Sequence, residues 1–288
     1  MMRIEAINAD FVANVSHVDL NETLTREEVG EIEQAIAHYA VLVFRDQPLT
    51  DDHHADFARR FGPIDKGLTK GSKGKRRLKN PDVIDLANVD DGGNVLAAEN
   101  IRNVSLIANQ FWHSDSSFKD PPAKFSILCG IDLPDEGGQT EFADQRAAYD
   151  ALDDKMKARI DNMLVEHFAF HSRDILGGSH HSQEEIDALP PVHWPMVHTV
   201  PESGRKSLFI GIHTRQIEGM PTAEARMLLH ELLEQTTQRQ FIYRHEWQNR
   251  DVIMWDNQCT LHRGRPYNLN SFRELRRCST EVSGKQVV

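Results

Sequence analysis

Residues 124–133 read KFSILCGIDL, an apolar run with β-branched and aromatic side chains that ends at a Pro-Asp-Glu-Gly turn. Runs of this kind, bounded by Pro, Gly and Asp, are typical of buried β-strands. Similar runs follow at residues 206–212 (KSLFIGI), 251–256 (DVIMWD) and 275–280 (LRRCST). Because these strands are short and scattered, the pattern predicts a mainly β protein, an antiparallel barrel or jelly roll with helical inserts.

Helices are predicted both before and after residues 124–133 in the sequence. Residues 23–40 contain a Thr-x-x-Glu capping box and an apolar stripe at helical spacing, and residues 50–61 carry acids in the first turn and stop before a glycine. The short β-branched run at residues 40–44 predicts a buried strand between them. Two helical inserts are expected among the later strands, at about residues 144–163 and 222–238.

The composition indicates a soluble globular protein. The chain has 288 residues, of which 39% are hydrophobic, and we expect one domain over residues 1–288. Glu5 and Asp10 interrupt any apolar leader, and no apolar segment approaches the roughly 20 residues of a membrane helix. Three cysteines without short spacing predict neither a disulfide framework nor a thiolate zinc site. We expect a cytoplasmic protein without a membrane partner, present as a homo-oligomer.

The net charge of -11 argues against a nucleic-acid partner, which requires a basic surface. One segment has the opposite character, because residues 66–79 (KGLTKGSKGKRRLK) hold seven of the 33 basic residues and no acid. Such a segment is commonly a solvated loop. It is also what a lid needs in order to attract a small anion to a nearby pocket. The sequence leaves both interpretations open.

The pattern His-x-Asp occurs three times, beginning at residues 17, 54 and 113, so by itself it is weak evidence of a metal site. His54 and Asp56 lie in a predicted helix, where residues two apart project to nearly opposite sides. We therefore expect both at the surface. In an extended segment, positions i and i+2 face the same way, and both His17–Asp19 and His113–Asp115 meet that condition. Other residues must decide between them.

His262, within MWDNQCTLHRGR (254–265), is the best candidate for a third ligand, because two histidines and one carboxylate are the usual set of non-haem Fe(II) oxygenases. A lone histidine at a strand end is also commonly a structural residue. Arg273 follows eleven residues later, and in a strand it shares a face with Arg277. Two inward arginines require anions, which a dicarboxylate supplies in bidentate geometry; on an edge strand they would be ordinary surface residues.

Taken together, these residues make the chain resemble the iron(II)- and 2-oxoglutarate-dependent dioxygenases of the taurine dioxygenase type. The pattern is a His-x-Asp pair at residue 113, a threonine at position 140 that comes 25 residues after the aspartate, and a histidine followed eleven residues later by an arginine. This combination is far more specific than any single motif. The resemblance covers nearly the whole chain, through FWHSDSSF (111–118), GGQTEFADQRAAYDAL (137–152), SGRKSLFIG (203–211), VIMWDNQCTLHRGR (252–265) and RELRR (273–277).

The resemblance implies a double-stranded β-helix of the jelly-roll, cupin-like kind, with Fe(II) as the metal and 2-oxoglutarate and O2 as cosubstrates. It implies that Thr140 and Arg273 hold the distal carboxylate of 2-oxoglutarate. Arg277 would lie near the metal-bound end of the cosubstrate or near the carboxylate of the prime substrate. The implied Fe(II) ligands, which are also the catalytic residues, are His113, Asp115 and His262.

The resemblance is greatest to members of the family that act on small anionic aromatic carboxylates. It implies hydroxylation of the carbon next to the ether oxygen of an aryloxyalkanoate such as 2,4-dichlorophenoxyacetate. The products would be a phenol and a 2-oxo acid, together with succinate and CO2. Lys70, His213 and Arg277 are the candidate substrate contacts, although an ordinary structural role also explains His213.

Several alternatives stay open. The same oxygenase chemistry suits a sulfonate or another natural carboxylate, because either substrate needs an arginine beside the iron. A zinc hydrolase is possible because His2Asp also binds zinc, but hydrolysis requires no dicarboxylate site. A third alternative is a binding protein that has lost catalysis. We expect structural roles for His167 and His245, and packing in the core for Trp112 and Trp255.

Overall fold

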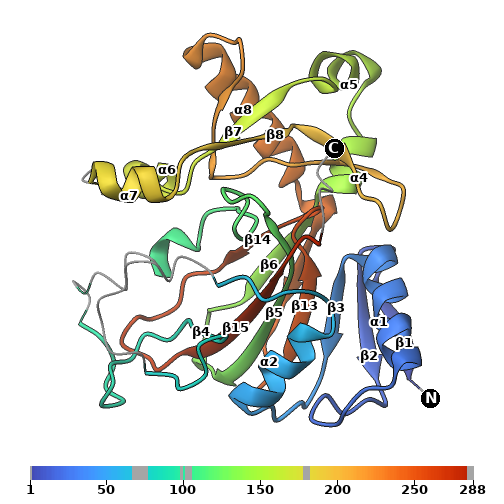
Figure 1. Cartoon of the computed structure of the whole chain (residues 1–288), viewed down its shortest axis with the longest axis vertical. Helices are drawn as coiled ribbons and strands as arrows, with labels where there is room; N and C mark the ends of the chain where they lie inside the picture. Colours follow the sequence, from blue (N-terminus) through green and yellow to red (C-terminus); the bar gives the residue numbers. More distant parts are fainter. Residues whose placement is uncertain (1, 67–76, 98–99, 101–105, 178–181, 284–288) are drawn as a thin grey trace.

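The computed structural model describes residues 2–66, 77–97, 100, 106–177 and 182–283 (Figure 1). A seven-stranded sheet has the order β1-β2-β3-β13-β5-β15-β4, in which only β2 and β3 are parallel neighbours. Strands from both ends of the sequence therefore share one sheet. In that order their bounds are Arg3–Asn8, Val12–Ser16, Val41–Phe44, Val252–Asp256, Ala123–Asp132, Glu274–Glu281 and Ile84–Asp85.

A smaller antiparallel sheet consists of β12 (Ile242–His245), β6 (Thr140–Asp144) and β14 (Thr260–Gly264), in that order. Its central strand packs against the large sheet, since the rings of Phe142 and Trp255 lie 5.4 Å apart in one buried cluster. Two packed sheets whose strands are mainly antiparallel are the arrangement of a jelly roll. The three runs predicted as strands at residues 124–133, 251–256 and 275–280 all lie in the large sheet.

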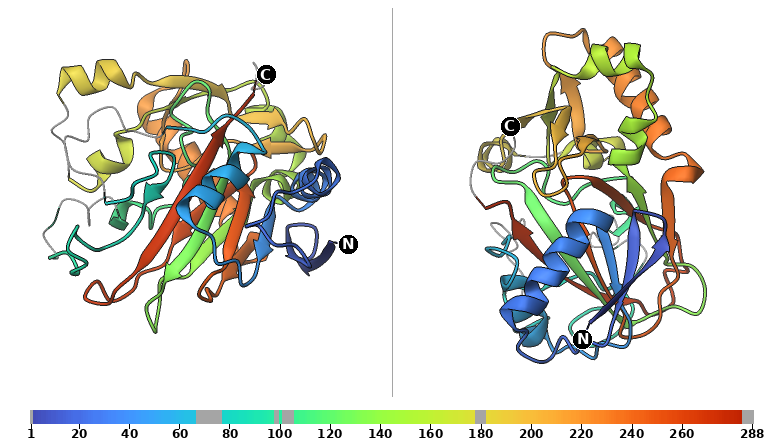
Figure 2. Two further views of the ribbon diagram at one scale, coloured as in Figure 1. Left: turned by 60° about the horizontal axis from the view of Figure 1, so that its bottom comes forward. Right: turned by 90° about the vertical axis from the view of Figure 1, so that its right-hand side faces the viewer.

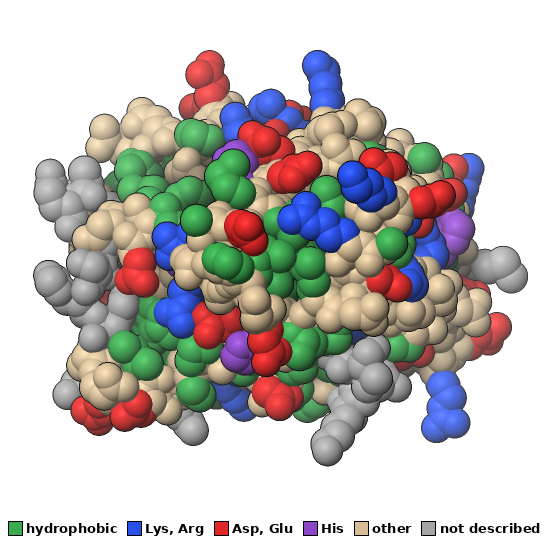
Figure 3. Space-filling view, turned by 90° about the horizontal axis from the view of Figure 1, so that it is seen from above, with side chains coloured by type: hydrophobic (Ala, Val, Ile, Leu, Met, Phe, Trp, Pro, Cys, Tyr) green, Lys and Arg blue, Asp and Glu red, His purple; other side chains and the backbone are tan. Residues whose placement is uncertain are grey.

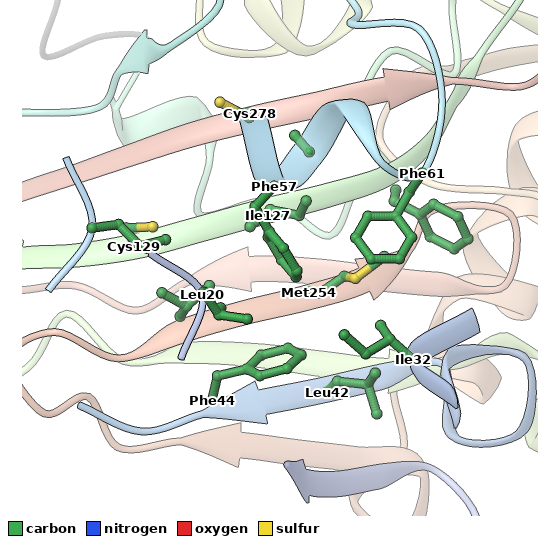
Figure 4. Packing of buried hydrophobic residues seen from close by; sticks show 14 of the residues in the cluster. Leu20, Ile32, Leu42, Phe44, Phe57, Phe61, Ile127, Cys129, Met254 and Cys278 are labelled. Atoms are coloured by element: carbon green, nitrogen blue, oxygen red, sulfur yellow. The ribbon is translucent and has the colours of Figure 1, made fainter. Parts of the chain in front are cut away.

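Helices α1 (Arg26–Tyr39) and α2 (Asp51–Arg59) cover the other face of the large sheet. The predicted capping box at the start of α1 is present, because the Thr25 side chain accepts from the backbone of Glu28 and the Glu28 carboxylate accepts in return. Figure 4 shows Phe57 of α2 and Phe61 just after it pointing toward Ile127 and Met254 of the sheet.

The prediction that His54 lies at the surface is wrong. This side chain is 1% exposed, and its Nε2 atom lies 3.0 Å from the carbonyl oxygen of Ile127 in β5. His54 shares the inward side of α2 with Phe57, three residues later, whereas Asp56 is exposed and binds Arg59. Burial lowers the pKa of His54 to about 4, so the imidazole is neutral and packs in the core.

Residues 145–241 form an insertion between two neighbouring strands of the small sheet, β6 and β12. Figures 1 and 2 show it above the sheets, in light green to orange. It has its own apolar cluster, whose buried members all lie between Tyr149 and Leu232. Its elements are α4 (Gln145–Asp150), α5 (Asp154–Ile160), β7 (Leu164–His167), α6 (His171–Ile175), α7 (Gln183–Ala188), β8 (Val192–Pro195), β9 (Val197–Thr199), β10 (Lys206–Leu208), β11 (Thr214–Ile217), α8 (Thr222–Thr236) and a 3-10 turn at Arg239–Phe241.

The helical insert expected at about residues 144–163 is confirmed and consists of two helices. The second helix begins where the Asp153 side chain accepts a hydrogen bond from the Met156 backbone amide at 2.7 Å. One expectation about this insertion needs correction. The strand expected at residues 206–212 is only three residues long and pairs with β9 in a separate two-stranded sheet. The helix beginning at Thr222 is confirmed.

The surface carries charges of both signs. On the face seen in Figure 3, Lys and Arg side chains are scattered among Asp, Glu and apolar side chains rather than gathered in one patch. Within the part of the chain that the structure describes, every helix is too short or too polar to cross a bilayer.

Candidate active site

His113 and His262 are brought together by the backbone. The His113 amide donates to the carbonyl of His262 at 3.0 Å, and the His262 amide donates to the carbonyl of His113 at 2.8 Å. The two imidazole centres are consequently 4.1 Å apart. Gly211 of the insertion packs against the segment that carries His113, since a Cβ at position 211 would lie 3.4 Å from the His113 Cα. The histidine-bearing segment is therefore held between β14 and the insertion.

The carboxylate of Asp115 lies beside both imidazoles. The Nε2 atom of His113 is 3.9 Å from one carboxylate oxygen, and the Nε2 atom of His262 is 3.7 Å from the other. Arg277 donates to Oδ1 and Ser126 donates to Oδ2 at 2.7 Å. Burial raises the pKa of Asp115, but Arg277 and the two histidines lower it more, and the net pKa is well below its usual range. The carboxylate is therefore ionised.

The ligand atoms of His113, Asp115 and His262 all lie within 4.8 Å of one another, and all three residues are buried. The Nδ1 atom of His113 lies 2.7 Å from the carbonyl oxygen of Phe111, so this nitrogen carries the proton and the Nε2 lone pair faces Asp115. Burial lowers the pKa of both histidines, which keeps the imidazoles neutral. Two neutral imidazoles and one carboxylate fit a divalent cation with open coordination positions.

A small cavity of about 50 Å³, open on one side, adjoins these residues, and both histidines line it together with Thr140, Arg273 and Arg277. The cavity is partly apolar, which lowers the local dielectric constant and strengthens interactions between charges. Its other lining residues are Leu86, Leu106, Asn109, Gln110, Leu128, Trp255, Gly264, Arg265, Tyr267 and Leu275.

Arg273 is 7% exposed and has no carboxylate partner among the residues that the structure describes. One guanidinium nitrogen donates to the carbonyl of Gly138 at 3.2 Å, the ring of Tyr267 lies 5.1 Å away, and Nε has no hydrogen-bond partner. Burial lowers the pKa of Arg273. A buried guanidinium in this state requires an anion, so Arg273 can bind a carboxylate in the cavity.

Thr140 and Arg277 complete the polar wall of the cavity. Thr140 stands at the start of β6 and accepts a hydrogen bond from Trp247 Nε1 at 3.0 Å. Arg277 lies on the same face of β15 as Leu275, and its Nε atom has no hydrogen-bond partner in the part of the chain that the structure describes. Arg276 points the other way and binds Asp51 at 2.7 Å, so the alternation expected from the sequence is confirmed.

His213 lies close to the candidate metal ligands, with its ring edge-on to His113 at 6.3 Å and to Phe118 at 4.7 Å. Its Nδ1 atom is buried and has no hydrogen-bond partner among the described residues, and burial lowers its pKa well below the usual value. The segment His17–Asp19 is not extended, because His17 has a φ of 61°. Both side chains are exposed. Lys70, with most of the basic segment, lies outside the described residues.

The sequence also singled out four residues for structural or core positions, and all are buried: Trp112, His167, His245 and Trp255. His245 binds Asp251 at 3.0 Å, and the ring of His167 stacks on Phe209 at 5.0 Å, in agreement with structural roles. Sequence reasoning missed Ser126 and Asn257, which together hold Asp115: Asn257 accepts from the Asp115 amide at 3.1 Å and donates to Ser126 at 3.0 Å. The sequence did offer one signal for Ser126, because it is a polar residue inside the apolar run at residues 124–133.

The chain matches the model of the family described as "Taurine catabolism dioxygenase TauD, TfdA family" over residues 3–279. It belongs to this family. The protein is therefore a 2-oxoglutarate-dependent dioxygenase that uses Fe(II), 2-oxoglutarate and O2, and the family decides against the zinc hydrolase.

Individual relatives are similar over nearly their full length. The dioxygenase is 48% identical to an alpha-ketoglutarate-dependent 2,4-dichlorophenoxyacetate dioxygenase of Cupriavidus pinatubonensis, over 94% of each chain. It is 34% identical to an (S)-phenoxypropionate/alpha-ketoglutarate-dioxygenase of Sphingobium herbicidovorans, over 94% of this chain and 91% of the relative. A crystal structure of AAD-2 with Mn(II) and N-oxalylglycine superposes with a TM-score of 0.91 at 39% identity, covering 99% and 98% of the two chains. The jelly-roll fold predicted from the sequence is confirmed.

Proposed function

We propose that this dioxygenase hydroxylates the carbon between the ether oxygen and the carboxylate of an aryloxyalkanoate such as 2,4-dichlorophenoxyacetate. The resulting hemiacetal then collapses to a phenol and a 2-oxo acid, which is glyoxylate for an oxyacetate. One O2 and one 2-oxoglutarate are consumed, and succinate and CO2 are released. Relatives named for 2,4-dichlorophenoxyacetate and for phenoxypropionate, 48% and 34% identical to this chain, support this substrate class.

The aryloxyalkanoate class rests on these relatives, and within the site Arg277 supports an anionic prime substrate, because it lines the cavity beside the candidate metal ligands in addition to Arg265 and Arg273. A single arginine, Arg273, suffices for the distal carboxylate of 2-oxoglutarate. Arg277 contacts Asp115 through one nitrogen only, which leaves its unpartnered Nε free for another anion. We assign it to the carboxylate of the prime substrate or to the nearby end of the cosubstrate.

We propose that His113, Asp115 and His262 hold the Fe(II). Bound Fe(II) supplies the redox chemistry that couples decarboxylation of 2-oxoglutarate to hydroxylation by O2. The hydrogen bonds from Ser126 and Arg277 fix the Asp115 carboxylate, and the Phe111 carbonyl fixes the tautomer of His113. These contacts orient the ligands before the cation binds.

Thr140 and Arg273 are proposed to bind the distal carboxylate of 2-oxoglutarate. The Arg273 guanidinium offers charge-assisted donors, and the Thr140 hydroxyl offers one more. Leucines and Trp255 around the cavity exclude water from the bound cosubstrate, which strengthens these bonds. Lys70 and His213 stay predictions as substrate contacts. A single domain over residues 1–288 is also proposed, supported by the sheet that both ends of the chain share, and the homo-oligomer stays a prediction.

A panel of acids tests the substrate class. The dioxygenase, loaded with Fe(II) and 2-oxoglutarate, is assayed for succinate and for phenol with phenoxyacetate, 2,4-dichlorophenoxyacetate, 2-phenoxypropionate and taurine. We expect the aryloxyalkanoates to give a kcat/KM at least about tenfold above that of taurine, since a neighbouring apolar wall contributes roughly 1.4 kcal/mol or more for an aromatic ring. A higher kcat/KM for the sulfonate would refute the substrate class and leave the oxygenase chemistry standing.

A further inference from the structure

We propose that Trp247 is a positioning residue for 2-oxoglutarate, because its indole N–H fixes the hydroxyl of Thr140. The inference rests on the proposed function, in which Thr140 and Arg273 bind the distal carboxylate of the cosubstrate. Trp247 lies just after β12, which pairs with β6 on the edge opposite to β14 and His262, and it is not among the residues that line the cavity.

The direction of the hydrogen bond gives Trp247 its role. An indole nitrogen only donates, so the Thr140 oxygen must accept from Trp247 at their separation of 3.0 Å. The hydroxyl proton of Thr140 must then point elsewhere. Among the residues that the structure describes, no acceptor takes that proton. The hydroxyl proton of Thr140 is therefore available to an anion bound beside Arg273. The Arg273 guanidinium donates to the carbonyl of Gly138, two residues before Thr140.

The indole of Trp247 is itself held in place from two sides. On one side is Gly130 of β5, where a Cβ would lie 3.0 Å from an indole carbon, so glycine lets the ring lie closer to the strand than a larger residue would. On the other side is His245, whose ring meets the indole edge-on at 4.9 Å. The buried Asp251 binds His245 at 3.0 Å and also binds Arg45. This arrangement fixes the indole N–H.

A fixed hydroxyl reduces the ordering needed when 2-oxoglutarate binds. Trp247→Phe keeps an aromatic ring at this position but removes the N–H. Since a neutral hydrogen bond contributes modestly to binding, we expect the Kd for 2-oxoglutarate to rise about threefold to tenfold. The KM for the prime substrate and the melting temperature should change little.

The test is isothermal titration of 2-oxoglutarate into the Mn(II)-loaded protein, which measures binding without turnover. Wild type is compared with Trp247→Phe, Thr140→Val and the double variant. We expect Thr140→Val to raise the Kd and the double variant to bind like Thr140→Val alone, because without the hydroxyl the indole N–H has nothing to orient. Trp194→Phe is the matched control, since it also loses an indole hydrogen bond, to the Ser117 carbonyl at 2.8 Å, away from the cavity.

The outcomes separate this inference from the proposed function. If Thr140→Val leaves the Kd unchanged, the proposed role of Thr140 fails, and this inference with it. If Thr140→Val weakens binding but Trp247→Phe does not, only the positioning role is wrong. An equal effect of Trp247→Phe with and without Thr140 would also overturn it, because it would mark a general structural effect. Should Trp247→Phe fold poorly, Gly130→Ala shifts the indole by a few tenths of an ångström and is expected to raise the Kd in the same direction, and an unchanged Kd would count against the positioning role.

Discussion

Replacing His262 with alanine is expected to lower turnover by at least about a hundredfold while the protein stays folded. Changes to the outer partners of metal ligands alone typically cost about 10- to 100-fold in metal affinity or activity, so loss of a ligand must cost at least as much. The fold should survive because the bridge from residue 262 to His113 is made by backbone atoms, which alanine retains.

The measurements for His262→Ala are the rate of succinate release, the number of Fe(II) ions bound per chain and the far-UV circular dichroism spectrum. His230→Ala is the matched control, since His230 is exposed on α8 and pairs with the exposed Glu234 at 3.6 Å. Full turnover of His262→Ala would show that His262 is not a ligand. A loss of secondary structure would be a different failure, which the spectrum detects.

Replacing Arg273 with glutamine is expected to raise the KM for 2-oxoglutarate by at least about thirtyfold. Loss of one partner of a buried, hydrogen-bonded charge pair costs about 2 to 5 kcal/mol or more, because the other charge is left without compensation. Glutamine keeps part of the volume and one donor, so the cavity should not collapse. The KM for the prime substrate should change much less than the KM for 2-oxoglutarate.

Arg276→Gln is the matched control for Arg273→Gln, because Arg276 is on the same strand but points to the opposite face, toward Asp51 and Glu274. Its KM for 2-oxoglutarate should equal that of the wild type. Steady-state assays with 2-oxoglutarate varied at saturating prime substrate measure both variants. An unchanged KM in Arg273→Gln would remove Arg273 from the cosubstrate site.

The strands of the large sheet were predictable because residues 124–133, 251–256 and 275–280 are local apolar runs with clear ends. In the insertion at residues 145–241, the helical inserts were predictable but the strands were not. Its short strands pair among themselves and pack on their own cluster, and no local pattern distinguishes them from strands of the jelly roll. The prediction that His54 is exposed was wrong for a related reason, since the side of a short helix that meets a sheet depends on tertiary packing.

The candidate site was predictable in its residue types but not in its supports. The face rule for extended chain favoured His113–Asp115, yet it equally favoured His17–Asp19, until the left-handed backbone at His17 excluded the second pair. Arg273 and Arg277 followed from strand alternation. The contacts of Asp115 with Asn257 and of Thr140 with Trp247 join residues more than 100 positions apart, which no spacing rule reaches.

The most direct test of the account is a crystal structure of the dioxygenase with Mn(II) and N-oxalylglycine, in which an N–H replaces one methylene of 2-oxoglutarate. We expect one ion bound by His113, Asp115 and His262, with the distal carboxylate of the analogue paired to Arg273 and Thr140. An ion bound elsewhere, or bound without His262, would contradict the central claim that these three side chains hold the metal.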